Sequence, residues 1–343
     1  MRITIKDIAK IAGVDHSTVS RSLNDSPRVS KKTKEKIKKI AEELGFEFNH
    51  NARALSSQKT GTVGLIYPET YEQTGTSLFL AYLLKNIQRI FEKHSLDVII
   101  KFPKNKFTNE SNIKKIISQR KVDGLIIASP DILPEDWEYI NKFNIPVTFL
   151  HFRPKYFHSD KIDYVYTDHK KGGYMATKYL LNLGHKKIIT ITDEMYDTQF
   201  QDRTHGYQEA LEEVGYKLKA ENVFKCKTSF EAGYELAKEN LEEFKNADAI
   251  FAQTDIVALG IQEYLKSKDV KIPQDVSIIG YDGLEIGEFF SPKLTTILQP
   301  KDKLADLACE RLVELLKERK EGIYLHKILE PKLLIRESCV EKK

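Results

Sequence analysis

The chain has 343 residues, of which 41% are hydrophobic and 30% charged, and its formal net charge is +4. This length suffices for a small domain followed by a body of two domains. No apolar run reaches the roughly eighteen residues of a membrane span, and no signal segment is visible, so we expect a cytoplasmic protein with no membrane partner. The three cysteines, Cys226, Cys309 and Cys339, lack metal-ligand spacing, which predicts reduced structural thiols and no metal site.

Residues 4 to 24 have the pattern of two helices joined by a tight turn. Thr4-Ile-Lys-Asp7 has the form of a capping box that starts the first helix. Gly13 suits the left-handed conformation that ends a helix, and Asp15 is a good N-cap for the second one. Apolar residues recur at helical spacing in the first helix: Ile5, Ile8, Ala9 and Ala12. This spacing predicts a helix-turn-helix, a shape that enters DNA grooves.

The second helix of this pair separates a buried side from a polar face. Val19 and Leu23 form the predicted buried pair. The opposite side carries, at i, i+3, i+4 and i+7, the polar residues Ser17, Ser20, Arg21 and Asn24. A third helix, Lys31 to Leu44, begins after the cap Ser30. Its apolar residues Ile37, Ile40 and Leu44 complete a small core.

Positive charge is concentrated in the same segment. Residues 1 to 60 contain 13 Lys+Arg and 7 Asp+Glu, a net charge of +6, whereas residues 61 to 343 have a net charge of −2. A lysine run such as that between positions 31 and 39 is, by itself, equally well explained as a solvated helix face. Combined with the helix-turn-helix spacing, the basic excess indicates contact with DNA phosphates.

The order of these residues resembles the lactose-repressor (LacI/GalR) family of bacterial transcription regulators. The resemblance rests on residues 12 to 24, Val29-Ser30, Leu44-Gly-Phe46, Asn49 and Ala52-Arg-Ala-Leu55. It implies that His16 and Ser17 occupy base-reading positions and that Arg21 reads a guanine through its bidentate fork. It further implies phosphate contacts by Thr4, Thr18, Ser20, Asn24, Ser30, Thr33 and Asn49. For each hydroxyl the alternative is a helix cap or a plain surface residue.

Residues 51 to 57, including Ala52, resemble the family's hinge helix. Such a short helix is expected to fold only on DNA, beside a partner copy. Leu55 would then be the apolar wedge in a minor-groove base step, although a Leu in a short amphipathic helix is ordinarily a core contact. Two residues depart from the family pattern, since Phe48 replaces a usual proline and Phe46 a frequent tyrosine. We therefore expect looser ordering of the hinge.

After the linker, apolar β-rich runs alternate with helical patterns. The expected strands of the body are 63–67, 97–100, 124–128, 146–150, 164–168, 187–191, 249–252 and 276–280. Helices are expected near 77–94, 111–119 and 134–143. This alternation predicts two doubly wound parallel sheets, each covered on both faces. The family resemblance implies that this body is like a periplasmic binding protein. Ligands of such sheets bind beyond the carboxyl ends of the strands.

The expected domain boundaries follow from this pattern. The helix-turn-helix domain spans 1–48, and the hinge and linker span 49–60. The first effector-binding subdomain is 61–162 with 293–322, and the second is 163–292 with 323–340. Asp168, at a strand end, is a candidate cap for a helix beginning near Gly172.

The family resemblance extends through the body in four blocks, namely 202–211, 255–260, 279–283 and 292–297. It implies that Arg203 and Asp282 bind an effector, since a guanidinium fork and a carboxylate suit vicinal sugar hydroxyls. Asp255 would share this role or lie behind it, and Phe79 and Leu80 would form an apolar wall. The alternatives are a surface salt bridge for Arg203 and a turn for Asp282.

Three further positions bear on the identity of the effector. Thr254 stands where the family usually has asparagine, and His151 where many members have aspartate. These changes remove an amide and a carboxylate from the hydrogen-bonding set, so a familiar sugar cannot be assumed. Phe230 is a candidate stacking residue.

The sequence therefore predicts a sequence-specific DNA-binding regulator, a repressor of sugar-utilisation genes. It would be a homodimer that binds pseudo-palindromic double-stranded operator DNA and is switched by a small sugar or sugar phosphate. Its C-terminal tail lacks a leucine heptad, which argues against tetramers. We expect no cofactor and no enzymatic activity, because phosphate-binding glycine loops, a nucleophile elbow and metal spacing are missing from the sequence. The alternatives are a global regulator with a phosphocarrier protein as corepressor, a sugar-binding protein, and an enzyme on this fold.

Overall fold

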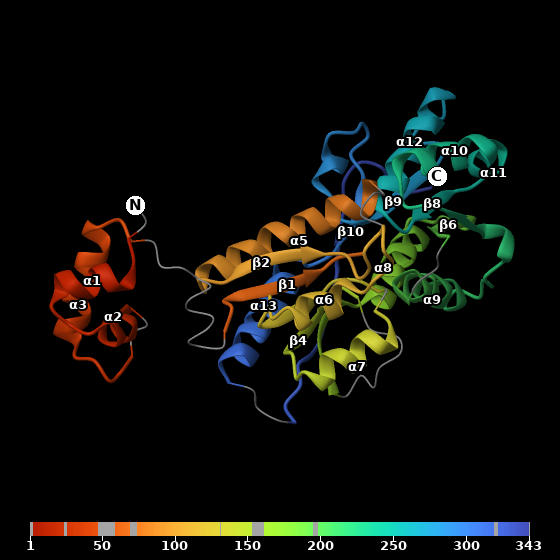
Figure 1. The fold of residues 1–343 in the computed structure, drawn as a ribbon. Helices are drawn as coiled ribbons and strands as arrows, with labels where there is room; N and C mark the ends of the chain where they lie inside the picture. The colour runs from red at the N-terminus through yellow and green to blue at the C-terminus, as the bar shows by residue number, and fades with distance from the viewer. Residues whose placement is uncertain are drawn as a thin grey trace. The chain divides into compact units, whose positions relative to one another are not determined.

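The computed structural model describes residues 3–23, 26–46, 59–68, 74–130, 132–152, 161–194, 198–318 and 322–342. It divides the chain into two compact units, Met1–Gly61 and Thr62–Lys343. The first unit is helical and the second contains both sheets (Figure 1).

The first unit is the predicted helix-turn-helix with a third helix. Its helices are α1 (Ile5–Ala12), α2 (His16–Leu23) and α3 (Lys31–Glu43). Gly13 ends α1 with φ +70°, the left-handed conformation expected of it. Ile8, Val19 and Ile37 are fully buried at the centre of the three helices. The three predicted helices are confirmed, and Leu44 caps α3 rather than belonging to it.

Helix α2 differs from the expectation in its buried side. Leu23 is only partly buried, whereas Ser22 is fully buried. The Ser22 hydroxyl can be buried because it donates to the Thr18 carbonyl oxygen over 2.7 Å. Phe46, one of the two departures from the family pattern, packs against this core.

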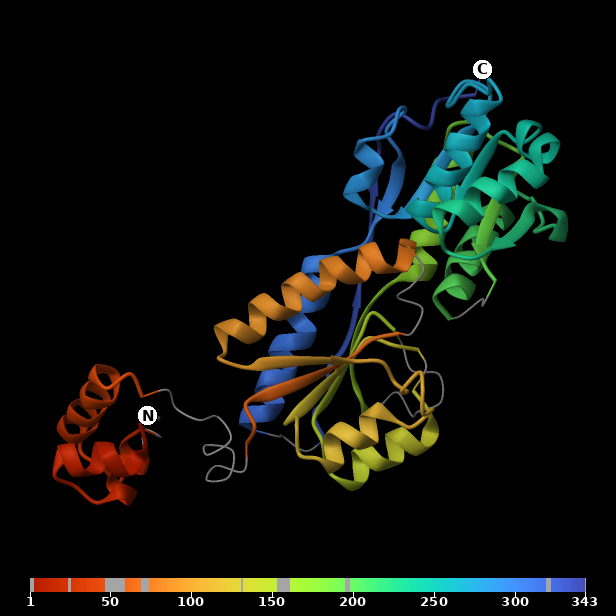
Figure 2. The ribbon, with the colours of Figure 1, turned by 45° about the horizontal axis from the view of Figure 1, so that its top comes forward.

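The first sheet of the second unit is entirely parallel. Its order is β11-β5-β4-β3-β1-β2. The strands are β1 (Thr62–Ile66), β2 (Asp97–Lys101), β3 (Gly124–Ile127), β4 (Val147–Leu150), β5 (Asp163–Thr167) and β11 (His326–Leu329). Helices α5 (Thr74–Lys93) and α13 (Lys301–Lys317) cover one face, and α6 (Asn112–Ser118) and α7 (Pro134–Lys142) the other (Figure 2). Each face has its own apolar core, as parallel sheets require.

The second sheet has the order β12-β10-β9-β8-β6-β7. The strands are β6 (Ile188–Asp193), β7 (Val223–Cys226), β8 (Ala249–Ala252), β9 (Ser277–Asp282), β10 (Thr295–Leu298) and β12 (Lys332–Leu334). All pairings are parallel except that of β12 with β10, which is antiparallel at the sheet edge. One core lies beneath α8 (His169–Asn182) and α9 (Thr198–Glu212), and the other beneath α10 (Phe230–Glu239), α11 (Leu241–Lys245) and α12 (Asp255–Ser267). The described residues also form two short 3₁₀ helices, Ala220–Asn222 and Glu285–Glu288.

The pairing of three strands corrects the predicted subdomain boundaries. β5 pairs with β4, so residues 163–167 belong to the first sheet and not to the second subdomain. β10 pairs with β9 in the second sheet, whereas the following α13 packs on the first. β11 then joins β5 in the first sheet, and β12 returns to the second. The chain thus passes between the sheets after β5, after β10 and after β11, so each of the three predicted boundaries lies one strand too early.

The cysteines are free thiols, with Cys226 and Cys309 buried and Cys339 partly buried. Burial raises the pKa of Cys226 to about 12, so its thiol stays protonated and inert. None of the helices in the described part of the chain is long and apolar enough to cross a membrane.

Candidate functional site

Helix α2 presents the predicted base-reading residues on the surface of the first unit. His16 and Arg21 are exposed, and Ser17, Thr18 and Ser20 are partly buried. Asp15 accepts a hydrogen bond from the Ser17 backbone N–H over 2.8 Å, which fixes the start of the helix. Four other predicted DNA contacts lie outside the described residues, namely Asn24, Asn49, Ala52 and Leu55.

Two of the predicted phosphate-contacting hydroxyl groups also serve as helix caps. The Asp7 carboxylate accepts from the Thr4 backbone N–H over 2.8 Å and from the Thr4 hydroxyl over 2.7 Å. At α3, the Ser30 hydroxyl oxygen accepts from the Thr33 N–H over 3.2 Å and lies 2.8 Å from the Thr33 hydroxyl. The alternative of a cap therefore applies to Thr4 and Ser30, while their phosphate contacts stay predictions.

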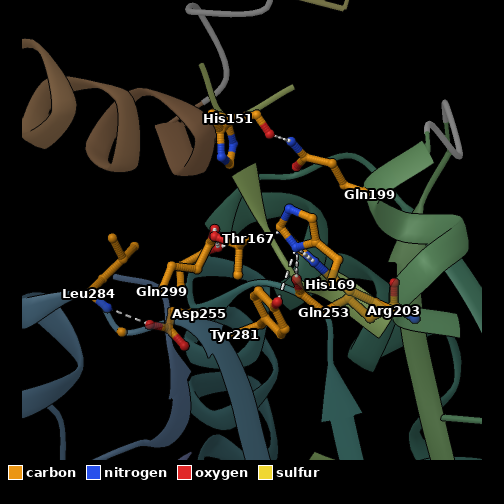
Figure 3. A network of polar contacts seen from close by, with 12 residues as sticks. His151, Thr167, His169, Gln199, Arg203, Gln253, Asp255, Tyr281, Leu284 and Gln299 are labelled. Carbon is orange, nitrogen blue, oxygen red and sulfur yellow. Dashed lines mark hydrogen bonds and ion pairs between the residues drawn. The ribbon is translucent and has the colours of Figure 1, made fainter. Parts of the chain in front are cut away.

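A buried polar cluster lies where strands of both sheets end in the second unit (Figure 3). From the first sheet it takes His151, directly after β4, and Thr167, the last residue of β5. From the second sheet it takes Gln253 after β8, Asp282 at the end of β9 and Gln299 after β10. Helices α9 and α12 add Arg203 and Asp255. The carboxyl edge is where ligands of such sheets are expected.

Arg203 occupies the middle of the cluster and is only 2% exposed. Its Nη1 donates to the carbonyl oxygen of Gln253, and its Nε donates to His169 Nδ1 over 3.3 Å. Its Nη2 lies 3.9 Å from Asp282 Oδ1. The guanidinium carbon lies 3.9 Å from the centre of the Tyr281 ring. Arg203 is therefore a buried, paired cation and not a surface salt bridge.

Asp282 connects Arg203 to the points where the chain passes between the sheets. Gln299 Nε2 donates to Asp282 Oδ1 over 2.8 Å, and Thr167 Oγ1 donates to Gln299 Oε1 over 2.8 Å. Lys301 Nζ donates to the carbonyl oxygen of Gly283 over 2.7 Å. Asp282 has φ +120°, a strained value for a non-glycine residue. Asp282 thus turns the chain, as the alternative interpretation predicted, and it faces Arg203, while its contact with an effector stays a prediction.

Asp255 lies behind this layer. Its carboxylate oxygens accept from the Leu284 backbone N–H over 2.6 Å and from the Thr296 hydroxyl. Complete burial, together with the charge of Asp282, raises the pKa of Asp255 to about 8. The carboxyl group of Asp255 is thus hydrogen-bonded within the protein, to residues that flank the turn at Asp282.

His151 forms the side of the cluster contributed by the first sheet. Its φ is +70°, and its carbonyl oxygen accepts from Gln199 Nε2 over 2.7 Å, which joins β4 to α9. Its ring centroid lies 4.5 Å from that of Phe79 and 4.6 Å from that of Phe152. Burial, and secondarily the charge of Arg203, lower the pKa of His151 to about 3, so its ring is neutral.

The other predicted effector residues have different surroundings. Leu80 is fully buried in the core of the first sheet, and its carbonyl oxygen accepts from the Tyr67 hydroxyl. Thr254 precedes α12, and its hydroxyl is buried without a hydrogen-bond partner among the described residues. Phe230 is partly buried against the second core, with its ring centroid 6.2 Å from that of Phe290. The effector contacts of these residues stay predictions.

Sequence reasoning missed several members of the cluster: His169, Gln199, Gln253, Tyr281, Gln299 and Lys301. Gln253 and Gln299 each directly follow a strand, a position that could have identified them. Asp168, as expected, caps a helix by accepting from the Lys171 N–H over 2.9 Å, but α8 begins at His169. The earlier start brings His169 into the cluster.

A cavity of about 670 Å³ lies away from this cluster, at the amino edge of the first sheet. It is lined by Trp137 of α7, by Val147 and Asp163 at the starts of β4 and β5, and by Tyr324. We place the candidate effector site in the polar cluster and not in this cavity, because ligands of open parallel sheets bind at the carboxyl edge.

A helix-turn-helix unit followed by a two-sheet body with a polar cluster between the sheets defines a DNA-binding transcription regulator of the two-part class. Residues 4–49 match the model for bacterial regulatory proteins of the lacI family, and residues 177–339 match a periplasmic binding protein-like domain.

Individual proteins agree with these matches along the whole chain. The ribose operon repressor of Haemophilus influenzae is 31% identical over 99% of both chains. The transcriptional repressor PurR of Vibrio vulnificus is 30% identical over 98% of both chains. A structure of the transcriptional regulator CelR in complex with cellobiose has a TM-score of 0.73 and 26% identity, and the match covers 98% of this chain and 100% of CelR. The chain belongs to the lacI family of bacterial transcription regulators.

Proposed function

We propose that the protein represses sugar-utilisation genes and that a small sugar-type effector, bound in the polar cluster, controls its affinity for operator DNA. The observation that carries this proposal is the cluster itself, which joins residues from the ends of both sheets. CelR was solved with cellobiose, and the Haemophilus relative is a ribose operon repressor. These relatives support a sugar as the effector.

The cluster is built at the connections between the sheets, which explains how a ligand could act on the whole body. Thr167 ends β5 and Gln299 follows β10, so the hydrogen bond between them lies at two of the three connections. The bond from Gln199 to His151 joins helix α9, which packs on the second sheet, to the end of β4 in the first. A ligand here would favour one relative orientation of the subdomains over another. Whether it weakens or strengthens operator binding depends on which orientation it prefers.

An exposed apolar edge of the first sheet supports a homodimer. β2 is the edge strand, and its residue Ile100 is 45% exposed, with Phe102 after it 36% exposed. Phe107, in the loop that follows, is 94% exposed. Natural proteins rarely leave such an edge uncovered. A second copy on this edge would supply the two α2 helices that a pseudo-palindromic operator requires.

The predicted DNA contacts remain part of this proposal. Arg21, His16 and Ser17 would read bases from α2, and Leu55 would enter the minor groove. A protein that binds operator DNA works in the cytoplasm, where bacterial DNA lies.

A thermal-shift screen tests the effector assignment. The full-length protein is heated with paired sugars and sugar phosphates, including D-ribose, cellobiose and D-ribose 5-phosphate. A ligand present at 100 times its dissociation constant stabilises the folded protein by about 2.7 kcal/mol. We expect a stabilising ligand for the wild-type protein and none for Arg203→Ala. Equal stabilisation of both proteins would place the ligand elsewhere.

A further inference from the structure

The buried cations of the cluster are already engaged within the protein. The buried cationic side chains of the cluster are those of Arg203 and Lys301, which are 2% and 7% exposed. Lys301 Nζ lies within hydrogen-bond distance of the carbonyl oxygens of Gly283 and Asp282, at 2.7 and 3.4 Å. Arg203 faces the Asp282 carboxylate, and rings of Tyr281 and Phe200 lie 3.9 and 4.8 Å from its guanidinium carbon. A phosphate group bound by either cation would therefore compete with these internal contacts.

His169 has a defined tautomer in this surrounding. Its Nδ1 lies 3.3 Å from Arg203 Nε and 3.0 Å from the Tyr281 hydroxyl. Since arginine can only donate, His169 Nδ1 must accept. Burial and the charge of Arg203 hold the pKa of His169 well below its ordinary value, so the imidazole is neutral. The single ring proton therefore resides on Nε2.

His169 Nε2–H is a buried donor that lacks an acceptor. His169 is 1% exposed, and its Nε2 has no hydrogen-bond partner in the part of the chain that the structure describes. His151 Nδ1 is buried in the same way, and the two ring centroids are 6.0 Å apart. In Figure 3, His169 Nε2 points away from Tyr281, toward the side of the cluster where His151 lies. Buried donors of this kind are normally satisfied, so His169 Nε2–H calls for an acceptor that the described residues do not supply.

We propose, on the basis of the effector function above, that His169 is a specificity-determining residue for an uncharged polyhydroxy effector, to a hydroxyl of which its Nε2–H donates. A hydroxyl both accepts and donates, so it also suits the neutral ring of His151. A phosphorylated form of the same sugar is rejected, because its charge would meet Asp282 and two cations that are already paired.

Two substitutions of His169 distinguish the role of its Nδ1 from the role of its Nε2. In His169→Asn the amide oxygen can replace Nδ1 as the acceptor for Arg203, but no group reaches the position of Nε2. In His169→Gln the longer amide brings an N–H near that position. His205→Asn, at an exposed position of α9, is the matched control. Isothermal titration calorimetry measures the dissociation constants of D-ribose, cellobiose and D-glucose. These are compared with the dissociation constants of the corresponding ribose and glucose phosphates.

We expect an Arg203-dependent neutral sugar to bind at least tenfold more tightly than its phosphate. His169→Asn should weaken this binding about tenfold, as the loss of one hydrogen bond implies, and His169→Gln should restore part of it. His205→Asn should bind like wild type. If His169→Asn does not fold, ¹⁵N-histidine spectra of the wild-type protein still report the Nε2–H tautomer and its shift on adding the sugar.

The results that would contradict the proposal for His169 differ from those that would contradict the proposed effector function. Arg203-dependent binding that favours the phosphate would overturn the inference and leave the effector function intact. So would neutral-sugar binding that is equal in wild type and His169→Asn, or an Nδ1–H tautomer for His169. Binding of no sugar, neutral or phosphorylated, would overturn both the inference and the effector function.

Discussion

At the residue scale, the buried carboxyl of Asp255 makes the stability of the body depend on pH. Its pKa is raised from 3.8 to about 8, so between these values the folded protein holds a proton that the unfolded chain has released. The native state therefore binds more protons, and stability falls as pH rises through this range. One such proton corresponds to about 1.4 kcal/mol per pH unit.

Asp255→Asn should remove this fall. Asn cannot ionise, and its amide can still accept from the Leu284 N–H. Chemical denaturation at pH 6.5, 7.0 and 7.5 should give a shallower pH dependence for Asp255→Asn than for wild type. Asp269→Asn, at an exposed position with φ +59° that Asn also adopts, is the matched control. Parallel curves for Asp255→Asn and wild type would show that Asp255 is ionised in the folded protein.

The sequence identified the charged residues of the cluster better than its neutral ones. Arg203, Asp255 and Asp282 stand in recognisable blocks, and the structure brings them together. Gln199 and His169 join the same cluster through contacts between segments far apart in the chain, and local patterns do not encode such contacts. The role of each charged residue also depended on tertiary structure, since only the hydrogen bonds place Asp255 behind Asp282.

At the scale of single elements, α2 carries the clearest prediction for DNA recognition. Arg21 is exposed on this helix. Arg21→Ala should cost about 1 to 3 kcal/mol of binding free energy on the cognate operator and far less on random DNA. Fluorescence anisotropy with both duplexes at one salt concentration measures this difference.

Arg28→Ala is the matched control for Arg21. Arg28 is also exposed but lies in the turn before α3. If Arg28 contacts only DNA phosphates, its substitution lowers the affinity for both duplexes by the same factor. A similar equal loss for Arg21→Ala would remove Arg21 as a base reader.

Most elements with a strong apolar pattern were predicted, whereas three of the exposed edge strands and the short buried strand β10 were not. The three head helices and the buried strands β1, β3, β4 and β8 lie close to their expected bounds. Three edge strands have largely exposed or half-exposed residues, namely β7, β11 and β12. They contain no continuous apolar run, so the sequence pattern does not predict them. The assignment of β5 failed for another reason, because its apolar run is the same whichever sheet it joins.

At the scale of the whole molecule, the exposed edge of β2 predicts that dimerisation and operator binding fail together. Phe102→Lys places a charge on this edge, where it should prevent close pairing with a second copy. Sedimentation should show monomers, and operator affinity should fall at least tenfold. Phe289→Lys, at a position 86% exposed after the 3₁₀ helix Glu285–Glu288, is the control. A dimeric Phe102→Lys protein would place the interface on another surface.

The two-part organisation was visible in the sequence because charge and pattern change together near residue 60. The net charge of +6 in residues 1 to 60 contrasts with −2 in the rest, and the compact units divide at Gly61. The predicted boundaries also give three connections between the sheets, but each lies before a strand that the structure assigns to the preceding sheet. Their positions were not predictable, because strand order depends on pairing between distant segments. Those connections carry the Thr167–Gln299 hydrogen bond, and with it the proposed coupling between effector and DNA.

The most direct test of this coupling is operator affinity of the full-length protein with and without a saturating sugar identified by thermal shift. Wild type should change its operator dissociation constant at least fivefold on adding the sugar, the lower range of allosteric coupling. Arg203→Ala should bind the operator like the sugar-free wild type and show no response to the sugar. A sugar response that persists undiminished in Arg203→Ala would contradict the account.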